Sequence, residues 1–138
     1  MHDSTPLLQQ TIVQACTQAR KIASSNSSSE DSVVSASIKL EKGDYALQTI
    51  QIPKNSSVTL LSKETVRLLF IGKRNRPMFI LEQNSTLILR DKLEIYYNCN
   101  NIQEVMKLMI KSTSTGQGDS SKADISKGVK ISLFSQKI

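Results

Sequence analysis

The sequence predicts a small, mainly β domain in the form of a solenoid, closed at its N-terminal end by one helix. Three observations predict it: an early segment with helical spacing, a long segment in which apolar residues alternate with polar ones, and a repeat within that segment. The chain has 138 residues, which is the length of a single domain, so residues 1–138 are taken as one unit.

The helix is predicted over residues 6–23. Apolar residues recur there at spacings of three and four, which is typical of a helix with one buried face. Pro6 suits the first helical turn, and Arg20 and Lys21 suit the negative end of the helix dipole. The predicted buried face consists of Leu8, Ile12, Ala15, Cys16, Ala19, Ile22 and Ala23. Residues 24–34 are rich in Ser and are expected to form a flexible loop, because they have little apolar surface to bury.

Short strands are predicted over residues 35–97, where apolar residues alternate and Gly, Pro and Asn mark the turns. Within this region, residues 52–60 align with residues 81–89 at an offset of 29 residues, and Asn55 and Asn84 occupy the same turn position. A repeat of this length favours a solenoid, in which each coil stacks on the next. The alternative is a small antiparallel β-sandwich with flanking helices, since two similar hairpins would give the same pattern.

One segment of the predicted strand region has a pattern of its own. Its positions are Ile38, Leu40, Gly43, Tyr45, Leu47, Ile50, Ile52, Pro53, Asn55, Val58 and Leu60. This pattern resembles the first coil of right-handed parallel β-helix proteins, the pectate-lyase-like superfamily. The resemblance implies that the helix over 6–23 caps the first coil and that residues 78–95 form a following coil. It covers roughly residues 6–97, and it concerns the fold and not an activity.

The C-terminal part is less regular. Residues 101–111 are predicted to form a helix, with Asn101 as its N-cap, while the alternative is a strand that continues the solenoid. Residues 112–128 are predicted to be an exposed loop. Residues 129–135 are predicted to form a terminal strand, which is either an edge of this domain or a strand that pairs with a protein partner or a second copy of the chain.

The residues that could carry catalysis or bind a metal are few. His2 is the only histidine, and Cys16 and Cys99 are far apart and are expected to be buried thiols, so no catalytic residue, metal site or cofactor is predicted. Carboxylates expected to face outward are scattered among lysines; they are Glu41, Asp44, Glu82, Asp91 and Glu94. A non-catalytic module is therefore favoured, and the alternative is a remnant or subunit of a polysaccharide lyase or hydrolase of the β-helix type.

The chain is basic, with 18 Lys and Arg against 12 Asp and Glu and a net charge of +6. The sharpest cluster is Lys73, Arg74 and Arg76 in one turn, which is a candidate patch for an acidic polysaccharide or a nucleic acid. The chain has no Trp and only three Tyr and three Phe, which does not favour base stacking. We therefore predict a structural or interaction module that binds a protein partner or an acidic polymer through an exposed β face or an uncovered end coil.

Two further expectations concern location. No apolar stretch reaches the roughly 18 residues that a membrane-spanning helix needs. The first residues show no basic segment followed by an apolar one, so an intracellular and cytoplasmic protein is expected.

Overall fold

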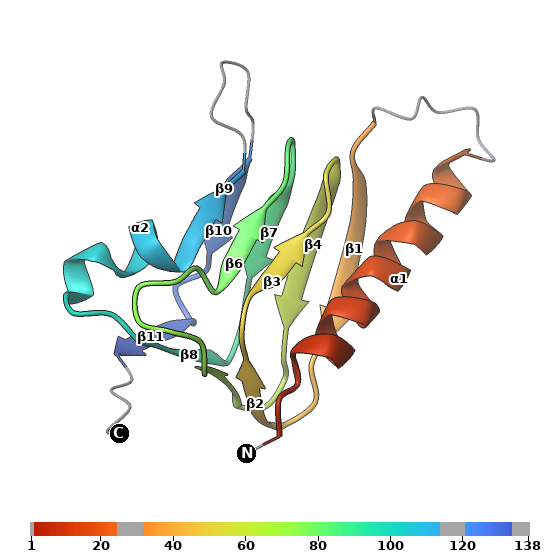
Figure 1. Cartoon of the computed structure of the whole chain (residues 1–138). Helices are drawn as coiled ribbons and strands as arrows, with labels where there is room; N and C mark the ends of the chain where they lie inside the picture. Colours follow the sequence, from red (N-terminus) through yellow and green to blue (C-terminus); the bar gives the residue numbers. More distant parts are fainter. Residues whose placement is uncertain (1, 25–31, 114–120, 134–138) are drawn as a thin grey trace.

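The computed structural model describes residues 2–24, 32–113 and 121–133, and it is mainly β (Figure 1). One long helix comes first and short strands follow. In chain order the elements are α1 (Thr5–Ser24), β1 (Val34–Lys39), β2 (Gly43–Leu47), β3 (Ile50–Ile52), β4 (Ser56–Leu61), β5 (Val66–Phe70), β6 (Phe79–Leu81), β7 (Thr86–Leu89), β8 (Leu93–Tyr97), a 3-10 turn (Ile102–Glu104), α2 (Val105–Met109), β9 (Ile110–Ser112), β10 (Lys122–Ile125) and β11 (Lys130–Leu133).

The strands form three sheets, in which every described pairing is parallel. Sheet 1 has the order β1-β4-β7-β10, sheet 2 the order β2-β5-β8-β11, and sheet 3 the order β3-β6-β9. Each strand therefore pairs with the third strand before or after it along the chain (Figure 1). The alternative of an antiparallel sandwich is wrong for these strands, because hairpins would pair consecutive strands in opposite directions.

The repeat seen in the sequence sets the register of two sheets. Ile52 lies opposite Leu81 in sheet 3, and Val58 lies opposite Leu87 in sheet 1. All four of these side chains are buried, with at most 3% of any of them exposed. An offset of 29 residues thus stacks aliphatic side chains on aliphatic side chains.

Alternate residues of all three sheets contribute to one apolar core. Along β4 and β5, buried side chains alternate with half-buried or exposed ones, as expected for strands with one face against a core. The rings of Phe70 and Tyr97, on adjacent strands of sheet 2, lie 5.1 Å apart at a tilt of 34°. Tilted aromatic pairs of this kind are favourable beyond the apolar area that they bury.

The predicted helix over residues 6–23 corresponds closely to α1, which lies against β1 and β3 (Figure 1). Leu8, Ile12 and Cys16 are buried as predicted. The prediction for Ile22 is wrong, because 58% of its side chain is exposed. Two residues earlier, Arg20 donates a hydrogen bond to the backbone oxygen of Asn55 in the turn before β4. The last turn of α1 thus lies beside this polar turn and not over the apolar core.

The helix predicted over residues 101–111 is shorter than expected. Asn101 does cap a helical turn, since its side-chain oxygen accepts a hydrogen bond from the backbone N–H of Gln103 at 2.9 Å. The helix α2 then ends at Met109, and the chain enters β9, which pairs with β6. The alternative of a strand therefore applies to the last residues, because backbone pairing with β6 replaces the helical hydrogen bonds there.

The loop predicted over residues 112–128 contains a strand, β10, and its residues 114–120 lie outside the described residues. The backbone N–H of Lys122 donates to the oxygen of Ser85 at 3.1 Å, so β10 is held by a strand distant in sequence. The strand predicted over 129–135 is β11, and its residues 134 and 135 are not described. Of the loop predicted over 24–34, residues 25–31 are likewise not described.

No helix in the described part of the chain combines the length and the apolarity that crossing a bilayer requires.

Candidate functional site

The last strand of each sheet has one side without a described partner strand. These strands, β9, β10 and β11, are together called the C-terminal edge. The backbone N–H group of Lys122 donates at 3.1 Å to the oxygen of Ser85, just before β7, and that of Ser126 donates at 2.9 Å to the oxygen of Leu89, the last residue of β7. Because the backbone groups of a parallel strand alternate in direction, those of the intervening Ala123 point to the opposite side. Among the described residues, no strand pairs with the backbone donors and acceptors of β10 on that side.

The inward-facing side chains of β10 and β11 are more exposed than their register partners, which are buried. Ala123 lies opposite Leu87 and is exposed, although Leu87 is fully buried. Leu133 lies opposite Tyr97, and 38% of Leu133 is exposed while none of Tyr97 is. Ile131, opposite the buried Ile95, is partly buried against the core. The stacks of inward apolar side chains, here called the apolar column, therefore continue into a last layer on β10 and β11, and no described element covers this layer.

The opposite end, called the N-terminal edge and formed by β1, β2 and β3, is covered by α1 and by the residues before it (Figure 1). Asp3 forms a parallel bridge with Ala46 of β2, and the N–H of Ser4 donates to the oxygen of Ala46 at 2.8 Å. Hydrogen bonds from Thr5 and Gln48 fix the Asp3 carboxylate, and those from Thr5 are the main reason that its pKa is lowered.

A side chain of α1 takes the place of a strand beside β3. The amide nitrogen of Gln9 donates to the backbone oxygen of Gln51 at 2.9 Å, and its amide oxygen accepts from the N–H of Gln51 at 2.8 Å. Gln9 thus pairs with the backbone oxygen and N–H of Gln51, which in the interior of a sheet would pair with a neighbouring strand. The two ends of the sheets thus differ: backbone groups of β2 and β3 have partners at the N-terminal edge, whereas on the outer side of β10 and β11 no described strand pairs.

A row of charges of alternating sign crosses the outer face of sheet 2. Asp44 of β2, Arg67 of β5, Glu94 of β8 and Lys130 of β11 are register partners in that order. The Nε atom of Arg67 lies 3.5 Å from Oε1 of Glu94, and Glu94 also accepts a hydrogen bond from the hydroxyl of Tyr96. This charge row ends at Lys130, the last described residue in its line.

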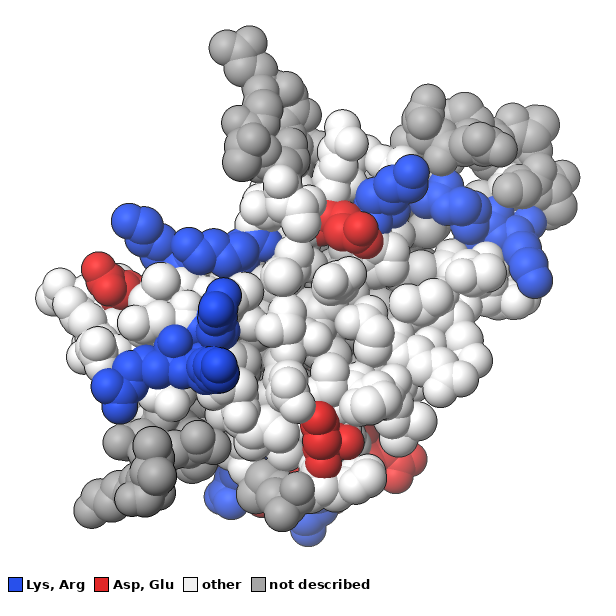
Figure 2. All heavy atoms as spheres, in the orientation of Figure 1, with Lys and Arg blue, Asp and Glu red and all other residues white. Residues whose placement is uncertain are grey.

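The structure places the predicted anion patch, Lys73, Arg74 and Arg76, in the turn between β5 and β6, with all three side chains exposed. Asn75, in the left-handed conformation with φ of 65°, lets the turn close, and its N–H donates to Asn98 at 3.0 Å. Figure 2 shows Lys and Arg atoms gathered over this turn, on the side of the molecule that carries α2. The turn therefore presents three cations together.

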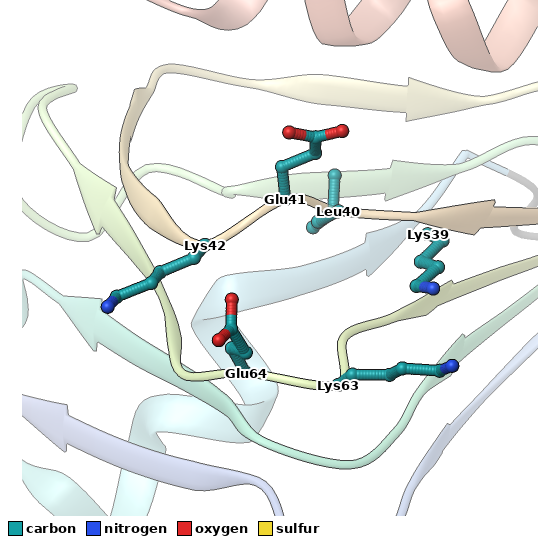
Figure 3. A pocket seen from close by; sticks show the side chains of 6 residues that line it. All are labelled: Lys39, Leu40, Glu41, Lys42, Lys63 and Glu64. Carbon is teal, nitrogen blue, oxygen red and sulfur yellow. The ribbon is translucent and has the colours of Figure 1, made fainter.

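The other basic residues of that part of the sequence lie elsewhere. Arg67 is in the charge row, beside Glu94. Lys63 lines a hollow of about 480 Å³ where β1 leads to β2 and β4 leads to β5, together with four further charged residues. Figure 3 shows Lys42 and Lys63 extending in opposite directions, away from the carboxylates between them. With charges of both signs that do not converge, this hollow is not a built site for an ion.

Both cysteines are free and buried, as the sequence predicts. Cys16 lines a hollow of about 460 Å³ between α1 and the turn before β4. Burial is the main cause that raises the pKa of the Cys16 thiol, which makes it a poor nucleophile. The Cys99 thiol donates to the backbone oxygen of Asn101 at 3.3 Å.

The five carboxylates singled out in the sequence do not come together. Asp44 and Glu94 are separated by Arg67 in the charge row, and Glu41 and Asp91 lie on turns. Within residues 2–24, 32–113 and 121–133, no three His, Cys, Asp or Glu side chains are grouped so as to hold a metal ion.

Comparison with known proteins gave no match to a family model, to a curated protein or to a solved structure.

Several residues of the two edges were not identified from the sequence. Gln9 covers backbone groups of β3, and Asp3 accepts a hydrogen bond from the side chain of Gln48, but a polar residue near the start of a helix gives no signal of such a role. Ala123 and Ile125 do alternate, yet four residues between polar segments are too few to indicate a strand.

Proposed function

We propose that the chain is a short solenoid that acts as a non-catalytic interaction module and binds a protein partner at the C-terminal edge by strand addition. The observation that carries the proposal is the coincidence of exposed inward side chains with backbone groups that lack a described partner. The regular pairing of each strand with the third one along supports the solenoid, since each turn of such a fold needs the next to bury its apolar face.

Strand addition uses the two features that this edge offers. Main-chain hydrogen bonds supply affinity, and alternate side chains of the added strand supply specificity. Ile131 and Leu133 would receive the inward side chains of the partner, and the peptide groups of the edge would pair with its backbone. Exposed sheet edges are usually shielded, because they promote association, so an uncovered edge with an apolar inner layer favours a docking role.

A short peptide tests the proposal. The neutral peptide Gly-Thr-Gln-Ile-Ser-Val-Gly has the alternation of an added strand and no side-chain charge. In a titration of the isotopically labelled protein followed by NMR, we expect amide shifts in β10 and β11 and none in β1 or β2. Shifts that are absent, or that are spread evenly over the molecule, would overturn the proposal.

Two leucine variants separate docking from loss of fold. Leu133→Ser removes an inward side chain of the C-terminal edge, and Leu7→Ser removes a leucine of α1 that is 68% exposed. Both variants should keep the circular dichroism spectrum of the parent. We expect Leu133→Ser to weaken the peptide shifts several-fold and Leu7→Ser to leave them unchanged. Equal effects would mean that the peptide does not bind through the apolar layer.

A further inference from the structure

The charge row of sheet 2 indicates what kind of strand fits beside β11. Its members alternate in sign, from Asp44 through Arg67 and Glu94 to Lys130. Side chains of register partners lie about 5 Å apart in a sheet, so each inner charge has an opposite charge on both sides. Lys130 has Glu94 on one side and no described partner on the other. On a strand added beside β11, a carboxylate opposite Lys130 would continue this alternation of charge.

The strands already in sheet 2 show a matching pattern. Asp44 and Glu94 are each followed by an inward apolar residue, a residue on the outer face, and a second inward residue. The corresponding inward positions of β11 are Ile131 and Leu133. A strand that continues both the charge row and the apolar column therefore has an acidic residue, an inward apolar residue, an outward residue and a second inward apolar residue in that order.

A second copy of the chain does not fit this role well. Head-to-tail stacking would bring Asp44 of one copy opposite Lys130 of another, but Ser4 already bonds to Ala46 on that side of β2. Two-fold stacking of C-terminal edges would bring together the exposed Lys111, Lys122 and Lys130 of both copies, and like charges repel across such an interface. The charge of the edge favours an acidic segment of a different protein.

We infer that the C-terminal edge takes an acidic extended segment of another protein, which pairs in parallel with β11 and places a carboxylate opposite Lys130 and aliphatic side chains opposite Ile131 and Leu133. The inference rests on the proposed docking function and adds the chemistry of the partner. An opposite-charge pair across two strands contributes modestly, so the preference for the acidic residue should be roughly two- to fivefold in affinity.

Three peptides that differ at one position test the inference. The neutral peptide described above carries Gln opposite Lys130, and its relatives carry Glu or Lys there. By the same NMR titration, we expect the Glu peptide to bind roughly two- to fivefold more tightly than the Gln peptide and the Lys peptide to bind least well. The charge swap Lys130→Glu should reverse the order of the Glu and Lys peptides.

Lys122→Glu is the matched control, because it changes the net charge of the same edge equally but lies in sheet 1, outside the charge row. It should lower the affinity for the Glu peptide only slightly and keep the order of the three peptides. If the Gln and Glu peptides bind equally, or if Lys122→Glu reverses the order as Lys130→Glu does, the inference is wrong while the docking function stands. If none of the peptides shifts the amides of β10 and β11, both fail.

Discussion

The side-chain amide nitrogen of Asn84 donates a hydrogen bond to the side-chain oxygen of Asn55 at 3.0 Å, across 29 residues of sequence. Both residues adopt the left-handed backbone conformation, with φ of 58° and 55°. Each stands in the turn that leads into a strand of sheet 1, and the N–H of Asn55 also donates to the backbone oxygen of Gln83 at 3.0 Å. The two turns are thus joined directly, side chain to side chain and backbone to backbone.

Replacing Asn84 with Ala should lower the free energy of unfolding by about 2 kcal/mol, because the hydrogen bond is lost and Ala tolerates the left-handed conformation poorly. Asn84→Gly removes only the side-chain contribution and should lower it by about 1 kcal/mol. Urea denaturation measures both values. Asn75→Ala is the control for backbone conformation alone, since Asn75 has φ of 65° and no described side-chain hydrogen bond. If Asn84→Ala and Asn84→Gly lower the free energy of unfolding equally, the left-handed conformation at this position does not add to the cost of Ala.

The features that could be predicted from the sequence are those set by local pattern. Alternation of apolar residues indicated the strands over 35–97, and the repeated Asn-Ser turn indicated that residues 52–60 and 81–89 are equivalent. Their parallel pairing follows, because equivalent turns of a repeat stack in the same direction. The helical spacing in turn located α1 to within a residue at each end.

The features that the sequence missed depend on contacts between distant segments. Lys122–Ile125 is a strand because β7 supplies its backbone partners, and Ile110–Ser112 is a strand because β6 does. The charge row could not be recognised either, since its four members are spread over the chain and are aligned only by the register of sheet 2. The basic turn, by contrast, is local, and the sequence alone places its three residues in one turn.

The Gln9 side chain should contribute measurably to stability through its two hydrogen bonds to Gln51. We expect Gln9→Ala to lower the free energy of unfolding by about 1 kcal/mol and to speed hydrogen exchange at the Gln51 amide, whose partner is lost. Gln10→Ala is the matched control on the same helix, because Gln10 is exposed and should change stability by less than about 0.5 kcal/mol. Unchanged exchange at Gln51 would argue against a role of Gln9 in covering β3.

The turn that carries Lys73, Arg74 and Arg76 should determine retention on heparin, a sulfated acidic polysaccharide. Replacing all three with Ala should lower the salt concentration of elution and reduce the slope of log affinity against log salt by roughly 2 to 3, because each cation releases counterions on binding. The matched control is Lys39, Lys42 and Lys63, which line a hollow together with two glutamates. If removing these three lysines has the same effect, net charge and not the turn governs retention.

Stability should depend on Tyr97 at high pH. The Tyr97 side chain is fully buried against Phe70, and its hydroxyl donates to the backbone oxygen of Arg76. Burial, with a smaller contribution from the charge of Cys99, raises the pKa of Tyr97 to about 12. An unfolded Tyr has a pKa of about 10, so between these values the folded protein holds a proton that the unfolded chain has lost. The stabilisation is therefore complete below pH 10 and is lost as the pH rises through 12.

At pH 11 this difference in pKa should lower the free energy of unfolding by about 1 kcal/mol relative to pH 9. Tyr97→Phe should lack this part of the pH dependence, although at neutral pH it should be less stable by about 1 kcal/mol because the Arg76 oxygen loses its partner. Chemical denaturation of both proteins at the two pH values measures the difference, and the lysines, which also titrate in this range, are common to both. Parallel pH profiles for the parent and the variant would show that the Tyr97 hydroxyl does not hold its proton more tightly in the folded protein than in the unfolded chain.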